Sequence, residues 1–205
     1  MSLTFMAKYD LREGNSCHIH LSLRGADGEP VLSGEGPHGF SPLMEHFLAG
    51  QLACLRELTY LLAPNVNSYK RFVAGSFAPT AVSWGLDNRT CALRVVGHGP
   101  LLRVENRVPG GEANPYLAVA ALVAAGLHGL EHELELPAPS VGNAYRSDAP
   151  WVPGTLREAA QPWADSPVAF GADVVEHYCN AARVELSAFD SAVTDWERQR
   201  GFERL

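Results

Sequence analysis

The stretch from Ser16 to Leu23 alternates between polar and apolar residues, and it constrains the fold more than any other part of the sequence. His18, His20 and Ser22 fall on one side of this alternation, and a cysteine and three aliphatic side chains fall on the other. A repeat of two residues is typical of a β-strand that buries one of its faces. The pattern therefore predicts a strand that presents two imidazoles and a hydroxyl on its polar face.

Three further segments are predicted to be strands, all before residue 108. They span residues 81–84, 91–96 and 101–107, and they are connected by short turns rich in glycine, proline, asparagine or aspartate. Residues 30–32 are a candidate for a short return strand, and residues 65–79 read as a long polar loop. The strands are therefore concentrated in one part of the chain.

Helices are predicted on both sides of these strands. Ser41-Pro42 and Asn114-Pro115 each combine a capping side chain with a proline at the first helical position, and they predict helices that reach about residue 62 and about residue 130. The chain after residue 153 is mostly helical, with Asp173 as the expected N-cap of one helix. This distribution predicts an α+β fold in which helices cover a sheet.

Composition excludes several classes of protein. Hydrophobic residues make up 46% of the 205 residues and charged residues 19%, which excludes global disorder. A formal net charge of −7 argues against non-specific nucleic-acid binding, and no apolar run is long enough to span a membrane. The cysteines show no CxxC spacing, which argues against a disulfide framework or a zinc finger and indicates the reducing cytoplasm. They are Cys17, Cys54, Cys91 and Cys179.

Basic residues concentrate between residues 69 and 107. This stretch holds six basic and two acidic side chains, a net charge of +4, so the rest of the chain carries −11. One arginine-rich stretch in an acidic protein suggests a local anion site rather than a basic surface. The sequence has no P-loop pattern, so arginines are the candidates to hold any bound phosphate. The six basic residues are Lys70, Arg71, Arg89, Arg94, Arg103 and Arg107.

Arg103, Glu105 and Arg107 alternate along the last predicted strand and therefore share a face. One interpretation is an ordinary solvated face with ion pairs. The other is a site in which the arginines bind different anions and the glutamate holds a divalent cation. His18 and His20 also allow two interpretations, either exposed side chains on a sheet or imidazoles directed into a cleft that binds a metal and an anion.

Five motifs occur in the order and with the spacing typical of glutamine synthetases. The chain resembles this family strongly from about residue 5 to residue 130, and it is closest in pattern to members that join glutamate to amines or polyamines. The resemblance implies part of the catalytic domain, with a curved, mainly antiparallel sheet of the half-barrel type covered by helices. The motifs are Gly14–Leu23, Asn67–Arg71, Asn88-Arg89 with Arg94, Arg103–Arg107 and Ala113–Leu117.

The resemblance implies a metal and nucleotide site around the histidine-bearing strand. His18 and Glu105 match two ligands of the metal that holds the nucleotide phosphates, and a mixed histidine and glutamate set suits Mg²⁺ or Mn²⁺. His20 and Ser22 match residues that contact the nucleotide. Arg103 matches a residue that stabilises ATP.

The same resemblance implies roles for the other arginines. Arg89 and Arg94 match catalytic residues that bind ATP and stabilise the transferring phosphoryl group. Arg71 and Arg107 match the pair that grips the substrate glutamate, and Gly14 matches a backbone contact to it. In the family reaction ATP phosphorylates the glutamate side chain and an amine then displaces phosphate. Such a reaction needs positioning and charge neutralisation more than covalent chemistry by the protein.

One departure from the family pattern concerns which amine the protein uses as a substrate. Members that use ammonia carry a glutamate in a Gly-aromatic-Glu-Ala-Pro pattern, where this chain has Gly75-Ser76-Phe77-Ala78-Pro79. A phenyl ring cannot accept a proton, but it can line a pocket for a larger amine. We therefore expect an ATP-dependent ligase for an organic amine or polyamine. The alternatives are a glutamine synthetase that uses ammonia and a non-catalytic module with the same fold.

The resemblance covers only part of the family's length. Full-length members also carry a small N-terminal β-grasp domain and a first half of the catalytic domain that holds several metal-binding glutamates. Residues 1–3 read like a vector-derived leader, and residues 4–205 like the C-terminal part of the catalytic domain. We expect this chain alone to be inactive and monomeric or dimeric, and the full-length protein to form a homo-oligomeric ring. The expected partners are glutamate and an amine or ammonia, without nucleic acid or membrane.

Overall fold

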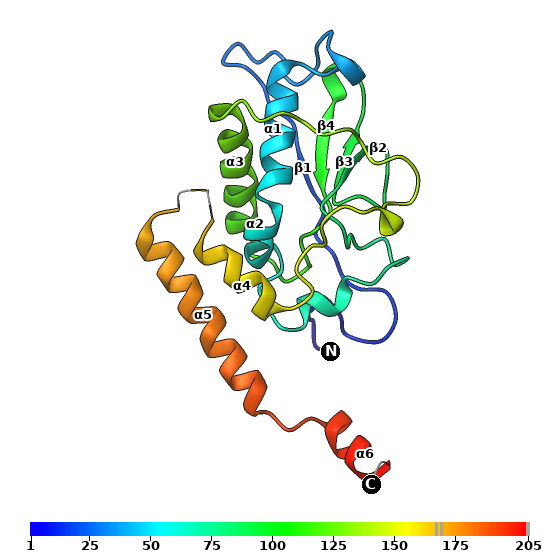
Figure 1. Cartoon of the computed structure of the whole chain (residues 1–205), viewed down its shortest axis with the longest axis vertical. Helices are drawn as coiled ribbons and strands as arrows, with labels where there is room; N and C mark the ends of the chain where they lie inside the picture. The colour runs from blue at the N-terminus through cyan, green and yellow to red at the C-terminus, as the bar shows by residue number, and fades with distance from the viewer. Residues whose placement is uncertain (167, 169, 204–205) are drawn as a thin grey trace.

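A four-stranded mixed sheet forms the centre of the fold (Figure 1). The computed structural model describes residues 1–166, 168 and 170–203. The strands are β1 (Ile19–Leu21), β2 (Trp84–Leu86), β3 (Leu93–Val96) and β4 (Arg103–Asn106). Their order is β1-β4-β3-β2, in which β1 and β3 run antiparallel to β4 and β2 runs parallel to β3. The sheet is open and mainly antiparallel, so the predicted α+β class is confirmed.

The strands are shorter than, or displaced from, the predicted ones. The strand predicted over residues 81–84 begins only at Trp84, because the Val82 N–H donates to the Pro150 carbonyl (2.7 Å) instead of to a neighbour in the sheet. The strand predicted over residues 16–23 is shortened to β1. Before β1, Ser16 pairs with Gly110 only through an isolated β-bridge, so no continuous strand forms there. Contacts with distant segments therefore set both boundaries.

Alternation along the strands divides the sheet into an apolar and a charged face. Val95 and Val104 are buried with Met44 and Leu48 of α1 (Pro42–Ala53), so this helix covers the apolar face. Arg94, Arg103 and Glu105 alternate with these valines and therefore lie on the opposite side of the sheet. The charged face is where the sequence places its candidate site.

The predicted helices are present with changed boundaries. The helix expected up to about residue 62 is divided into α1 and α2 (Leu55–Leu62) at Cys54, whose φ of −92° and ψ of 3° interrupt the helix locally. Ser41 caps α1, and Asn114 caps α3 (Pro115–Glu131) by accepting the N–H of Tyr116 (3.0 Å). Short 3₁₀ turns span Pro37–Gly39, Ser68–Arg71, Gly99–Leu101 and Ala144–Arg146.

Three helices follow in the last part of the chain: α4 (Leu156–Ala164), α5 (Ala172–Ser191) and α6 (Asp195–Glu203). The expected N-cap role of Asp173 is wrong, because α5 begins two residues earlier than expected, at Ala172, after the N-cap residue Gly171 with a φ of +85°. Asp173 lies in the first turn instead, where a carboxylate favours the helix dipole. None of the described helices is both long and apolar enough to cross a membrane.

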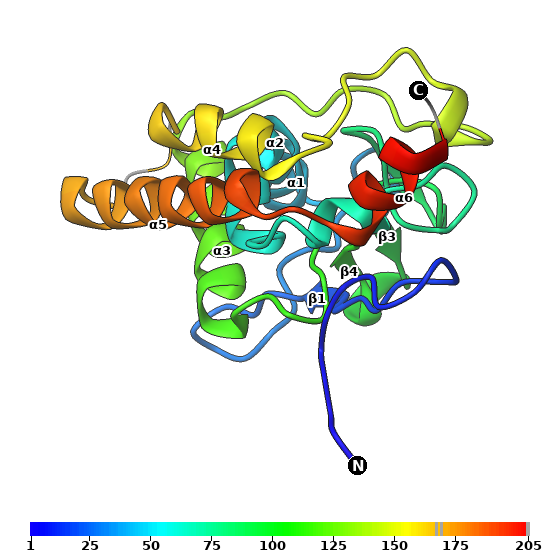
Figure 2. The same ribbon diagram turned by 90° about the horizontal axis from the view of Figure 1, so that it is seen from below.

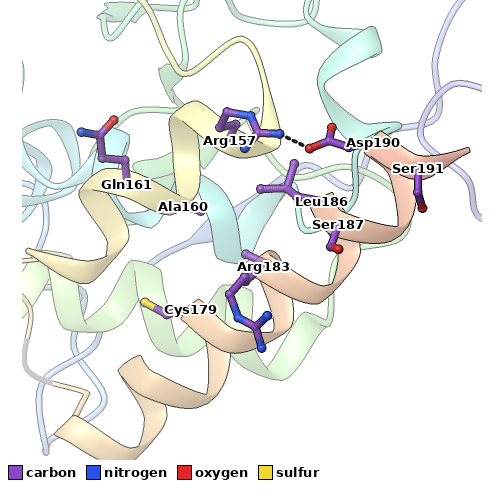
Figure 3. A pocket seen from close by; sticks show the side chains of 10 residues that line it. Arg157, Ala160, Gln161, Cys179, Arg183, Leu186, Ser187, Asp190 and Ser191 are labelled. Carbon is purple, nitrogen blue, oxygen red and sulfur yellow. Dashed lines mark hydrogen bonds and ion pairs between the residues drawn. The ribbon is translucent and has the colours of Figure 1, made fainter.

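The helix α5 packs on the body through only part of its length. Figure 2 shows it running alongside α4, where Trp163 is fully buried in a cluster that includes Tyr60 and Tyr178. A groove of about 700 Å³ lies between α4 and α5, and an ion pair between Arg157 and Asp190 crosses it (Figure 3). The distal end of α5 then extends away from the body, with α6 beyond it (Figure 1).

Residues 137–144, here called the edge segment, lie along the outer side of β2. The Ser140 N–H donates to the Trp84 carbonyl (2.8 Å), and the Trp84 indole N–H donates to the Pro137 carbonyl (2.8 Å). The Asn88 side chain donates to the Gly142 carbonyl (2.8 Å). Such cover protects a sheet edge from pairing with another chain.

Three glycines let α1 and α3 approach closely. A Cβ added at Gly50 would lie 2.2 Å from the Ala125 carbonyl oxygen, and one at Gly129 would lie 2.0 Å from the His46 carbonyl oxygen. A Cβ at Gly126 would lie 2.0 Å from the Phe47 ring. Two of these neighbours are backbone atoms, so a side chain here requires the helices to separate.

The Gly50→Ala substitution is expected to lower the free energy of unfolding by about 1–3 kcal/mol, because the added methyl group overpacks the contact between α1 and α3. The matched control is Gly201→Ala on α6, where no atom lies within 4 Å of the new Cβ. Alanine is favoured over glycine in helices by about 0.5–1 kcal/mol, so this control should not destabilise. Urea unfolding followed by circular dichroism measures both variants, and wild-type stability of Gly50→Ala would contradict the packing argument.

Candidate functional site

The buried carboxylate of Glu105 is the centre of the charged sheet face. The strand register places His20 of β1 and Arg94 of β3 directly opposite it. The His20 Nε2 lies 3.5 Å from Glu105 Oε1, and the Arg94 Nη1 lies 2.9 Å from Glu105 Oε2. Arg107 donates from Nη1 to Oε1 at 3.1 Å. The structure thus brings the imidazole of His20, which is distant in sequence, together with a carboxylate and two guanidinium groups.

This carboxylate is ionised although only 3% of the Glu105 residue surface is exposed. Burial raises its pKa, but hydrogen bonds from Arg94 and Arg107 and the charges of both arginines outweigh burial, so the pKa is lowered overall. A buried charge of this kind is stable only with such partners. The cluster therefore behaves as one electrostatic unit.

His18 is a neutral imidazole at neutral pH. Burial, followed by the nearby positive charge of Arg107, lowers the pKa of His18 to about 4. Its Nδ1 is buried and has no hydrogen-bond partner among the described residues. A neutral imidazole with an unpaired buried nitrogen is suited to binding a metal ion.

Arg71 and Gly14 lie against each other near this cluster. A Cβ added at Gly14 would lie 2.6 Å from Arg71 Cγ, so the backbone of Gly14 packs directly on the arginine stem. Arg71 is buried, and its Nη2 donates to the Val108 carbonyl. Burial lowers the pKa of Arg71 to about 10, partly offset by the charge of Glu112, and Arg107 lowers it further. The guanidinium still carries its charge at neutral pH.

The remaining predicted residues lie at the periphery of the cluster. Arg103 donates from Nε to His20 Nδ1 at 3.3 Å. Ser22 and Arg89 are exposed, and within the described chain neither forms a hydrogen bond to the cluster. Arg89 lines a cavity of about 600 Å³ together with Phe77. Seven of the predicted residues therefore contact one another, five in the group around Glu105 and two, Gly14 and Arg71, against each other.

Two residues at the site were missed by sequence reasoning. Asp87 accepts from Arg94 Nε (2.9 Å), so Arg94 is held between two carboxylates. The Tyr145 hydroxyl donates to the Ala78 carbonyl (3.0 Å) and so fixes the loop that follows Phe77. Asp87 occupies a predicted turn and Tyr145 an irregular region, and neither belongs to a periodic pattern that would have revealed its contact.

The donor set for a metal ion is partial. Within the residues that the structure describes, no three His, Cys, Asp or Glu side chains come together in a geometry that could hold an ion. His18 and Glu105 fit a divalent cation by their chemistry, and a complete coordination shell needs further ligands.

Comparison with known proteins places this geometry in a family. Residues 1–201 match the family described as "Glutamine synthetase, catalytic domain". The chain is 67% identical, over its whole length and 45% of the relative, to γ-glutamylethanolamide synthetase of Streptomyces coelicolor. It is 40% identical to glutamate–isopropylamine ligase of a Pseudomonas species, over 98% of this chain and 46% of that one.

A solved structure of GmaS in complex with ADP superposes with a TM-score of 0.88 at 33% identity, covering 98% of this chain and 49% of that one. The chain thus spans about half the length of the curated relatives described above. On the evidence of sequence and fold together, this chain belongs to the glutamine synthetase family and matches its catalytic domain.

Proposed function

We propose that this protein is an ATP-dependent ligase that joins the γ-carboxylate of glutamate to an organic amine by way of a γ-glutamyl phosphate. Two relatives are named as ligases of this kind: a γ-glutamylethanolamide synthetase and a glutamate–isopropylamine ligase. Enzymes of the glutamine synthetase family generally use ATP and divalent metal ions. The observation that carries the proposal is the Glu105 carboxylate, buried between two arginines on one sheet face.

The charged face has an excess of positive groups. Arg94, Arg103 and Arg107 surround Glu105, and the exposed Asp87 adds one further carboxylate at the rim. Clustered guanidinium groups repel one another unless anions balance them, and their planar donors suit phosphate and carboxylate oxygens. ATP phosphates and the carboxylates of glutamate are anions of this class.

His18 and Glu105 would hold the divalent cation that accompanies the nucleotide. The Nδ1 of His18 has no hydrogen-bond partner among the described residues and can offer a lone pair in the tautomer protonated at Nε2, and a carboxylate keeps acceptor capacity beside its two arginine bonds. The cation, Mg²⁺ or Mn²⁺, would neutralise phosphate charge. Water, nucleotide oxygens or other groups of the protein would complete its coordination.

The nucleotide and phosphoryl roles follow the position of each side chain. His20, Ser22 and Arg103 would contact the nucleotide along the edge of the sheet. Arg94 would face the transferring phosphoryl group, because Asp87 and Glu105 already fix its orientation without reorganisation. Arg89, which is exposed, would join it when ATP is bound.

Glutamate would bind between Arg71 and Arg107. The two guanidinium groups are close enough for the charge of Arg107 to lower the pKa of Arg71. An anion between them would remove this repulsion. The backbone of Gly14 packs on Arg71 and would face the same ligand.

Phe77 would determine the choice of amine. Its carbonyl accepts from Arg107 Nη2 (3.1 Å), which ties its backbone to the charged cluster. Its φ is +58°, and 58% of its surface is exposed. The cavity beside it also has Leu86 and Val141 in its wall, and these apolar side chains suit the alkyl part of an organic amine.

Assembly and compartment are also part of the proposal. Exposed aromatic side chains on the distal helices, Phe189, Trp196 and Phe202, fit contacts with further copies in a homo-oligomeric ring. All four cysteines are free thiols, which fits the cytoplasm.

The test measures phosphate release from ATP and glutamate by the protein expressed from its complete gene. Ammonia, ethanolamine, putrescine and spermidine are compared in parallel. At least one organic amine is expected to give a rate about tenfold or more above that with ammonia, because an apolar wall discriminates by contact with the alkyl group. Equal rates with ammonia and every amine would overturn the choice of substrate, and no release with any of them would favour a non-catalytic module.

The Phe77→Glu substitution is expected to shift the preference towards ammonia by about tenfold or more in the ratio of kcat/KM values, because it restores a proton acceptor and removes the apolar wall. Phe77→Leu is the matched control and should keep the preference for the organic amine. The same phosphate-release assay measures both ratios. An unchanged ratio in Phe77→Glu would show that this side chain does not select the amine.

Glu105→Gln is expected to lower the free energy of unfolding by about 3–5 kcal/mol, because it leaves buried guanidinium groups without their carboxylate. It should also abolish phosphate release. Asp87→Asn is the matched control, since Asp87 pairs with the same Arg94 but its side chain is 79% exposed. This control should leave the unfolding midpoint unchanged. Denaturant titration separates the two, and equal stability of both variants would contradict the central position of Glu105.

A further inference from the structure

We propose that the C-terminal end of α3 carries a surface site for a borderline divalent metal ion such as Zn²⁺, Ni²⁺ or Cu²⁺, and that His128 and His132 are its protein ligands. This site is independent of the ligase function proposed above. It is formed by one helix and the turn that follows it.

The two imidazoles lie side by side on one helix face. Residues four apart in a helix are neighbours on its surface, and two histidines at this spacing are a recurrent metal-binding arrangement. The ring centroids of His128 and His132 are 4.2 Å apart, with 39° between the ring planes. His132 is exposed and His128 is half-buried, so an ion can reach both from solvent.

A backbone hydrogen bond fixes the tautomer of His132. Its Nδ1 lies 2.9 Å from the His128 carbonyl oxygen, and a carbonyl can only accept. Nδ1 therefore carries the proton, and Nε2 of the neutral ring has its lone pair free. In metal-binding histidines, the ring nitrogen that does not bind the metal commonly donates to a carbonyl oxygen, and this hydrogen bond fixes the orientation of the ring.

The local charge attracts cations. The last carbonyls of α3 give its C-terminus a partial negative charge. Glu131, Glu133 and Glu135 are exposed and close in sequence to His132, and residues 131–135 include no lysine or arginine. In the described part of the chain no third His, Cys, Asp or Glu is placed to complete a ligand set with the pair, so water would fill the remaining positions. A pair of imidazoles favours Zn²⁺, Ni²⁺ and Cu²⁺ over Mg²⁺.

The site is separate from the Glu105 cluster. Figure 1 shows α3 on the outer side of α1, while the sheet lies on the other side of α1. The cluster is on the sheet face that points away from α1. An ion at His128 and His132 would therefore leave the metal ligands proposed for catalysis unchanged.

The test titrates the untagged 205-residue protein with Ni²⁺ or Zn²⁺ alone, by calorimetry in the presence of excess Mg²⁺. His128→Gln and His132→Gln are each expected to remove one bound ion, or to weaken its binding at least about tenfold, since loss of even a supporting group costs about 10–100-fold in affinity. His177→Gln, which removes an exposed histidine from helix α5, is the matched control and should keep the full stoichiometry. Circular dichroism checks that all variants remain folded.

Two further readouts separate a true two-histidine site from single-site binding. The Cu²⁺ complex should show paramagnetic resonance coupling to two imidazole nitrogens in the wild type and to one in each variant. The ion should also raise the unfolding temperature of the wild type and of His177→Gln, but not of the two variants, because it binds only the folded helix. Unchanged stoichiometry in both His128→Gln and His132→Gln, or coupling to a single nitrogen in the wild type, would overturn the proposal.

Discussion

The ion pairs of Glu105 with Arg94 and Arg107 are the interaction on which the rest of the charged face depends. A carboxylate this deeply buried is unstable without its partners, and the partners would repel one another without it. The pairing of β4 with β1 and β3 brings these groups together, so the fold of the sheet and the electrostatics of the site have a single origin. The same arrangement leaves a surplus of positive charge that suits anionic ligands.

Sequence patterns predicted the parts of this site that depend on local alternation. The period of two at residues 16–23 and 101–107 placed His20 and Glu105 on polar strand faces, and the strand register pairs these two residues in one sheet. His18 and Arg107 lie just outside β1 and β4. The excess of arginine between residues 69 and 107 also predicts an anion site, and this stays a prediction. Capping side chains at Ser41 and Asn114 predicted the starts of α1 and α3.

Other features depend on contacts that no local pattern encodes. Residues 80–82 bond to residues 150–152, so the start of β2 was displaced from the prediction. Asp87 reaches Arg94 across a turn, and the close approach of α1 and α3 depends on which glycines face each other. Each of these is decided by the partner segment in three dimensions, whereas propensity and periodicity report only on the segment itself.

The edge segment over residues 137–144 has a consequence for how the molecule behaves in concentrated solution. It has no regular secondary structure for most of its length, yet its hydrogen bonds to Trp84 and Asn88 occupy the outer side of β2. If this segment detached, the backbone N–H and C=O groups on the outer side of β2 would be exposed. Other copies of the protein would then be able to pair with this edge and aggregate. An irregular stretch of chain, rather than the sheet itself, therefore protects the β2 edge from pairing with other copies.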